Sequence, residues 1–226
     1  MRRVVVLLCL AAAALGGCGD SEPVGSTRLK LAAIGDSVTA GLGSANGSCR
    51  TYVDEEECEA RRLSYAAVYA RRNGIADDEW TNTAQSGSSP ADWLRGPRLG
   101  AIVARRPKLT FVTLGANPLV GVKEGELVRR LKRIYHRLLS VEGNRVVVVA
   151  YYDSDPLRTV NERVERAVAE VQGEPGGNRL RLVRPPIPVP GDCGDPGVPT
   201  TRCLHPSAQG HQKIALAIAS LVPLSP

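Results

Sequence analysis

The chain has 226 residues, of which 43% are hydrophobic and 4% aromatic, and its formal net charge is +6. This length and composition are typical of one globular domain with a substantial core. The basic excess is mild and stacking side chains are few, so the composition argues against a nucleic-acid-binding protein.

The N-terminal segment differs in character from the rest. Arg2 and Arg3 precede an apolar stretch, residues 4–15, which is too short to span a bilayer and is typical of a secretory signal. Residues 15–18, Leu-Gly-Gly-Cys, resemble the lipobox of bacterial lipoproteins, in which the cysteine is lipidated and becomes the first mature residue. That resemblance implies a lipid anchor on Cys18.

Three segments follow from this pattern. We predict a signal peptide over residues 1–17, a lipidated cysteine and polar tether over 18–27, and one domain over 28–226. The protein would be extracytoplasmic and held on the bacterial cell membrane, because more than one acyl chain gives stable anchoring. The alternative is an ordinary cleaved signal peptide and a secreted protein.

Four cysteines fall in the predicted domain, namely Cys49, Cys58, Cys193 and Cys203. Four cysteines permit three pairings. We expect Cys49–Cys58 and Cys193–Cys203, because each pair brackets a single glycine- or acid-rich loop. The competing interpretation is a metal site, but the spacing lacks the close Cys-x-x-Cys clustering of zinc sites, and we expect no metal.

Apolar runs and helical periodicity alternate along this domain. The predicted strands are residues 29–34, 80–84, 109–114, 146–150 and 180–183. The predicted helices are residues 64–72, 94–105 (interrupted by Gly and Pro), 127–139, 160–171 and 214–221. This order predicts a three-layer α/β/α sandwich with a mostly parallel, flavodoxin-like sheet.

Polar residues follow three of the predicted strands. Ser37, Gly87 and Asn117 each lie just beyond a strand end. Because ligands of such sheets gather at the carboxyl ends of the strands, we expect these residues at one edge.

Four short blocks contain these residues and a histidine. They are residues 33–41 (Ala-Ile-Gly-Asp-Ser-Val-Thr-Ala-Gly), 82–87 (Asn-Thr-Ala-Gln-Ser-Gly), 114–117 (Leu-Gly-Ala-Asn) and 205–211 (His-Pro-Ser-Ala-Gln-Gly-His). Taken in this order, the blocks resemble the SGNH/GDSL family of serine hydrolases, and the resemblance spans roughly residues 31–219.

The resemblance implies the role of each residue. Ser37 would be the nucleophile, preceded by Asp36 as a supporting residue, and His205 would be the base. The backbone N–H groups of Ser37 and Gly87 and the side-chain amide of Asn117 would form the oxyanion hole. Gly87 suits this role independently, because a residue without Cβ lets a substrate approach its amide closely.

The other two histidines have simpler interpretations. His136 lies on the basic face of a predicted helix and is expected at the surface. His211 lies inside the last helix and is expected to pack or cap. His205 precedes Pro206, which favours an extended conformation at the start of that helix.

One departure from the family pattern concerns the orientation of His205. The family usually has an aspartate three residues before its histidine, but Arg202 stands there. The predicted Cys193–Cys203 loop favours a backbone carbonyl as the acceptor for the imidazole Nδ1–H. Asp192 or Asp195 of the same loop is the second possibility, and loss of activity is the third.

We therefore expect an extracytoplasmic serine esterase that acts on small esters of lipids or carbohydrates, works as a monomer and needs no cofactor. Phe111 is the only phenylalanine, which favours a short acyl group. The alternatives are a weak or inactive binding lipoprotein on the same scaffold, or an acyltransferase acting on a cell-envelope glycan.

The Gly41–Gly47 stretch superficially resembles a dinucleotide fingerprint, but its glycine spacing is one residue too long, so we do not expect nucleotide binding.

Overall fold

A computed structural model describes residues 28–44, 59–117 and 123–223. The predicted signal peptide, the anchor at Cys18, the tether and the Cys49–Cys58 pair lie outside the described residues. Within them, no helix is both long enough and apolar enough to cross a membrane.

The described residues form a parallel sheet with strand order β2-β1-β3-β4-β5, which is the flavodoxin-like order. The strands are β1 (Leu31–Gly35), β2 (Trp80–Asn82), β3 (Leu109–Thr113), β4 (Arg145–Val149) and β5 (Leu180–Val183). The α-helices are α1 (Ser37–Ala40), α2 (Glu59–Leu63), α3 (Tyr65–Arg72), α4 (Pro90–Arg95), α5 (Arg98–Ala104), α6 (Glu124–Leu139), α7 (Arg158–Gln172) and α8 (Ala208–Leu221). Short 3-10 turns are η1 (Asp77–Glu79), η2 (Gly177–Arg179) and η3 (Thr200–Arg202).

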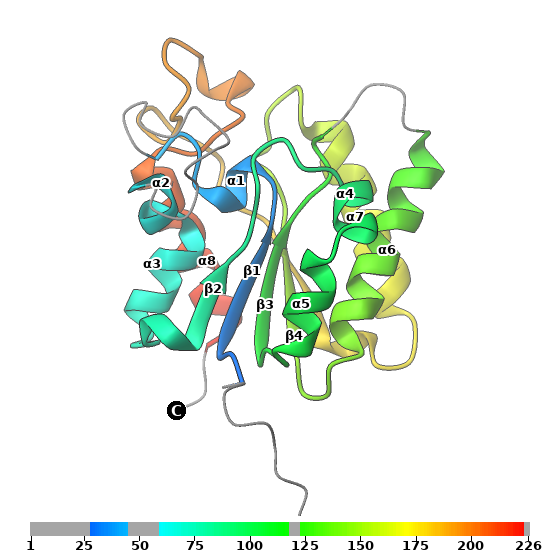
Figure 1. The fold of residues 1–226 in the computed structure, drawn as a ribbon. Coiled ribbons are helices and arrows are strands. Elements are labelled where there is room, and N and C mark those ends of the chain that lie inside the picture. Colours follow the sequence, from blue (N-terminus) through cyan, green and yellow to red (C-terminus); the bar gives the residue numbers. More distant parts are fainter. Residues whose placement is uncertain (1–27, 45–58, 118–122, 224–226) are drawn as a thin grey trace, which may run out of the picture.

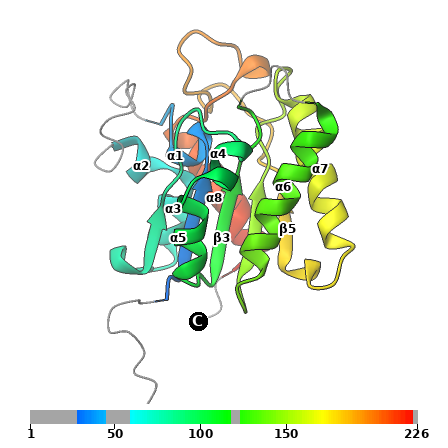
Figure 2. The same ribbon diagram turned by 45° about the vertical axis from the view of Figure 1, so that its right-hand side comes forward.

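The helices cover both faces of the sheet. Figures 1 and 2 show α3 and α8 on one face and α4, α5, α6 and α7 on the other. The pairs α3–α8 and α6–α7 pack along their lengths. The three-layer α/β/α prediction is therefore confirmed.

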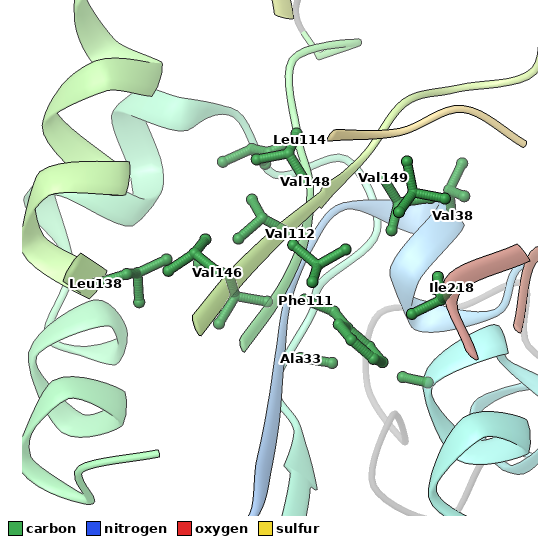
Figure 3. Packing of buried hydrophobic residues seen from close by; sticks show 14 of the residues in the cluster. Ala33, Val38, Phe111, Val112, Leu114, Leu138, Val146, Val148, Val149 and Ile218 are labelled. Carbon is green, nitrogen blue, oxygen red and sulfur yellow. The ribbon is translucent and has the colours of Figure 1, made fainter. Parts of the chain in front are cut away.

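The central strands are buried on both sides because their side chains alternate between the two helical layers. In Figure 3, Val112 and Val146 lie on the side of Leu138 from α6, whereas Phe111 lies on the side of Ile218 from α8. All five side chains are buried. This explains why β3 and β4 are nearly continuous apolar runs in the sequence.

One predicted helix, residues 94–105, is two helices in the structure. Helix α4 begins earlier, at Pro90, where Ser89 and Asp92 form a capping box. It ends at Arg95 with Gly96 as its C-cap, and Pro97 is the N-cap of α5. The Gly-Pro pair therefore separates two helices instead of interrupting one.

The strand order reverses between β1 and β3, which are paired from Leu31↔Leu109 to Gly35↔Thr113. Beyond the carboxyl ends of these strands the connections leave in opposite directions, and such a switch point forms a crevice where ligands bind. The segments that follow β1 and β3 contain Ser37 and Asn117.

Candidate active site

The first element of the site is the turn that places Ser37. Strand β1 ends at Gly35, and Asp36 caps α1 by accepting a hydrogen bond of 3.1 Å from the N–H of Val38. Ser37 is the first residue of α1, and 8% of its surface is exposed. Only glycine fits at position 35, because a Cβ there would lie 2.3 Å from the carbonyl oxygen of Thr113.

The second element is the segment before α8, which lies over the same end of the sheet as α1 (orange in Figures 1 and 2). It is folded back on itself: Gly194 N–H donates to the His205 carbonyl at 2.8 Å, and Ser207 N–H donates to the Asp192 carbonyl at 2.7 Å. The Ser207 side chain caps α8. His205 is thereby held next to a helix start, and its Nε2 lies 3.1 Å from Ser37 Oγ.

The carboxylate of Asp195 holds the far side of this imidazole. Its Oδ1 lies 2.7 Å from His205 Nδ1, and its Oδ2 accepts from the N–H groups of His205 at 2.9 Å and Leu204 at 2.8 Å. Burial raises the pKa of Asp195, but the hydrogen bonds from His205 and the two backbone N–H groups outweigh it and lower the pKa.

The structure therefore places the carboxylate of Asp195, the second possibility, against Nδ1, where a backbone carbonyl was expected. The usual spacing missed it because Asp195 lies ten residues before His205, not three. The sequence did contain a signal: Asp195 stands two residues after Cys193, and His205 two residues after Cys203. A disulfide between those cysteines brings the two residues together.

The other two residues considered for this role lie elsewhere. Asp192 is buried, and its carboxylate accepts from Lys213 Nζ at 2.8 Å and from the N–H of Val189 at 3.0 Å, so it fastens the loop to α8. Arg202 is exposed, in η3.

The structure joins Cys193 and Cys203 in a disulfide, as predicted. Within the described residues, Asp195 and these two sulfurs are the one group of potential metal ligands that lie within 4.8 Å of one another. Both sulfurs are used by the disulfide and Asp195 Oδ1 by His205, so this group suits a cross-linked loop and not a metal.

Close packing around Gly43 accounts for a glycine in the stretch after α1. It has φ of +91°, and a Cβ on it would lie 2.8 Å from the Cβ of His205. A Cβ on Gly194 would likewise lie 2.2 Å from the carbonyl oxygen of Gly43. Two loops far apart in the sequence therefore meet backbone to backbone, and this close approach sets the distance between Ser37 and His205.

A buried chain of polar groups links the loop before Ser37 to the loop of Asn117. Tyr151, just beyond β4, donates a short hydrogen bond to Asp36 Oδ2 and accepts one of 3.0 Å from the N–H of Ala116. Burial raises the pKa of Asp36 to about 6, against the lowering effects of the Tyr151 and Val38 hydrogen bonds and of the nearby His205. Sequence reasoning did not identify Tyr151, although its place at a strand end was a signal.

Gly87 lies in a turn that is fastened to the end of β1. Ser88 N–H donates to the Gln85 carbonyl at 3.1 Å, and Gly87 has φ of +76° at the third position of that turn, which favours glycine. The Ser88 hydroxyl and the indole N–H of Trp93 both donate to the Gly35 carbonyl, at 2.9 and 3.2 Å. The turn is therefore fixed two residues before Ser37.

The remaining histidines lie where the sequence suggested. His136 is exposed on α6 and faces Glu174 at 3.2 Å. His211 is fully buried in α8, where its Nδ1 accepts from the N–H of Tyr65 at 3.2 Å. Burial lowers the pKa of His211 to about 3, so it is a neutral packing residue near neutral pH.

A serine, a histidine and a carboxylate hydrogen-bonded in series beyond the strand ends of a parallel α/β sheet define a serine hydrolase arrangement. Residues 33–213 match the model of the GDSL-like lipase/acylhydrolase family. The chain belongs to this family and is a carboxylic ester hydrolase. Among curated protein sequences, none matches the chain.

Solved structures share the fold at low sequence identity. One is a catalytic mutant of Axe2, an acetylxylan esterase from Geobacillus stearothermophilus, with 17% identity, a TM-score of 0.62, and 88% of this chain and 96% of that chain covered. LAE5, an alpha/beta hydrolase enzyme from the metagenome of Lake Arreo, Spain, has 18% identity and a TM-score of 0.57, covering 86% of this chain and 94% of its own. TesA has 20% identity and a TM-score of 0.58, covering 85% of this chain and 97% of its own.

Proposed function

We propose that the protein is an extracytoplasmic serine esterase that hydrolyses esters of short acyl groups through a covalent acyl-enzyme. Ser37 is the nucleophile, His205 the general base and Asp195 the residue that orients the imidazole. The observation that supports this most strongly is the series of contacts from Ser37 Oγ to His205 Nε2 at 3.1 Å and from Nδ1 to Asp195 at 2.7 Å.

The proton moves in a defined direction. Asp195 accepts from Nδ1–H, so Nε2 is left as the acceptor that takes the Ser37 proton while Oγ bonds to the ester carbonyl carbon. The protonated imidazole then donates to the alkoxy oxygen, and the C–O bond to the alcohol breaks. In the second half, His205 takes a proton from water, the hydroxide oxygen bonds to the acyl carbon, and Ser37 leaves with the proton returned.

The negative charge that develops on the carbonyl oxygen needs donors already in place. We assign these to the backbone N–H groups of Ser37 and Gly87 and to the side-chain amide of Asn117. Two features support the assignment: the Gly87 turn is tied to the Gly35 carbonyl, and the loop before Asn117 is tied through Ala116 and Tyr151 to Asp36.

Two further parts of the proposal come from the sequence. The N-terminal segment favours export and a lipid anchor on Cys18, and we propose a monomer at the membrane surface. The contact between Asp195 and His205 supports a catalyst over the inactive binding protein, an alternative that arose from the arginine at position 202.

The experiment is a chain-length series of nitrophenyl esters with wild type, Ser37→Ala and His205→Ala. We expect hydrolysis to fall with acyl length in wild type and to fall by about 10⁵–10⁶ in kcat in both variants, as for removal of a nucleophile or base that acts as one unit. Similar rates in wild type and Ser37→Ala would overturn the proposal.

A further inference from the structure

A groove with an excess of arginines runs along the edge of the sheet, beside the site. It has a volume of about 970 Å³ and is lined by residues of α2, α3, α5 and the edge strand β2. Figures 1 and 2 show where these elements lie in the fold. Its lining includes Arg61, Arg62, Arg71 and Arg98 but, among the described residues, only one carboxylate, Asp77. This volume is near the upper end of the range for ligand sites, roughly 300–1,000 Å³.

Two of the arginines that line the groove, Arg71 and Arg98, donate to neutral groups. Arg71 donates to the carbonyl of Arg62, and Arg98 donates to the side chain of Gln85 while its guanidinium stacks 4.8 Å above the ring of Trp93. Within the described part of the chain, Arg62, Arg71 and Arg98 have no carboxylate partner. None of these three charges is paired with a carboxylate of the described residues, and a guanidinium suits carboxylate or phosphate oxygens.

The groove reaches the site through the β2 strand end. Asn82, on its floor, donates to the carbonyl of Thr39 in α1 at 2.8 Å. Gln85, at its other end, donates its N–H to the Gly35 carbonyl and begins the turn that contains Gly87. The end of β2 and the turn after it therefore contribute both to the lining of the groove and to the hydrogen bonds around the segment that contains Ser37.

The edge strand itself is closed to a peptide strand. Arg61 donates to the carbonyls of both Asn82 and Ala84, so two of the acceptors that an added β-strand would use are already bonded. Half-buried Trp80 also lines the groove, as do Thr81 and Thr83. An aromatic ring among hydroxyl and amide groups suits a sugar, which offers both apolar C–H faces and hydroxyls.

We propose that the groove binds the chain of an acylated glycan that bears repeating anionic groups, either carboxylates or phosphates, while one of its esters is cleaved at Ser37. This inference rests on the proposed function for its catalytic step. Binding of the glycan chain depends only on the groove, so the two can fail separately.

The test compares three acetylated polymers of equal acetyl content: a polygalacturonate, a phosphate-containing glycan and a neutral xylan. We expect kcat/KM for acetate release to be higher on at least one anionic polymer than on the xylan, and to fall as salt rises toward 0.3 M only on the anionic ones. The anionic polymer that is preferred identifies the charged group. Equal rates on all three polymers would overturn the proposal.

The variant pair Arg62→Gln/Arg71→Gln removes two exposed charges from the groove. Its matched control, Arg72→Gln/Arg133→Gln, removes two exposed charges outside it. We expect the groove pair to lower kcat/KM on the preferred polymer about tenfold, through KM, and to leave nitrophenyl acetate hydrolysis within twofold. An equal loss in the control pair would show a general charge effect and overturn the proposal.

Binding is measured separately in Ser37→Ala by titration calorimetry with the unacetylated anionic polymer. If the polymer binds, the groove pair weakens that binding and wild type cleaves no ester, the proposed esterase is refuted but the groove proposal stands. Ester cleavage by wild type with no such binding would refute the groove alone.

Discussion

Replacing Asp195 with asparagine tests how His205 is oriented. The carboxylate accepts three hydrogen bonds, one from the imidazole and two from backbone N–H groups, all between 2.7 and 2.9 Å. Asparagine has one oxygen where aspartate has two, so it can face either the imidazole or the backbone with an acceptor, but not both. Either the imidazole then loses the acceptor that fixes its tautomer, or the backbone N–H groups of Leu204 and His205 lose theirs.

The size of the effect follows from the exposure of the pair. Loss of the carboxylate in a fully buried triad lowers turnover by about 10⁴. Both side chains here are 21% exposed, so water replaces part of the interaction. We expect kcat to fall about 100- to 1,000-fold in Asp195→Asn, which is roughly 3–4 kcal/mol of activation free energy, with KM within threefold.

The assay is steady-state hydrolysis of nitrophenyl acetate, with Asp153→Asn as a control that removes an exposed carboxylate outside the site. A second readout is stability. Because the pKa of Asp195 is lowered in the folded protein, its contribution is present near pH 7 and is lost as the pH falls through the folded value. The difference in unfolding free energy between wild type and Asp195→Asn should therefore shrink below about pH 4. An unchanged kcat in Asp195→Asn would refute this role.

Four further results are expected. Arg202→Asp should change kcat less than threefold, since Asp195 already orients the imidazole; a gain of several hundred-fold would mean that it does not. Cys193→Ala/Cys203→Ala should lower the unfolding free energy measured in urea by about 3 kcal/mol and lower kcat, because the disulfide closes the loop around Asp195; unchanged values would contradict this. Gly43→Ala should lower kcat at least tenfold by pushing His205 away, whereas Gly74→Ala, with nothing within 4 Å, should alter stability alone; equal kcat values would refute the packing argument. Wild type should lose about 2–3 kcal/mol of unfolding free energy as the pH rises from 4 to 6, because the native Asp36 carboxyl binds its proton more tightly than the unfolded one, and Asp36→Asn should not show this loss. An equal loss in wild type and variant, measured by urea unfolding, would contradict the burial effect.

The layers and strand positions could be predicted because burial on both faces leaves a clear pattern. Strand β4 is a run of β-branched residues, and α6 and α7 repeat apolar residues at helical spacing, so their identity depends on local sequence. The observed strand ends differ from the predicted ones by one or two residues. The predicted helix over residues 94–105 is two helices in the structure, because capping at Ser89 outweighs the weak apolar periodicity there.

The candidate site was predictable only where its residues lie in recognisable blocks. Ser37, Gly87, Asn117 and His205 follow strands or precede a helix, and chain order indicated their common edge. Asp195 does not stand at the usual spacing before His205, because the loop that returns it to His205 is defined by the Cys193–Cys203 disulfide and by antiparallel contacts between residues 192–194 and 205–207. The groove along β2 was equally hidden, since its arginines come from three helices and face one strand only after folding.

Reaction of the protein with a fluorophosphonate probe, followed by peptide mapping, most directly tests whether Ser37 is activated by His205. We expect one adduct, on the peptide that contains Ser37, formed much more slowly in His205→Ala and absent in Ser37→Ala. An adduct on another residue, or labelling of Ser37 at the same rate without the imidazole, would contradict it.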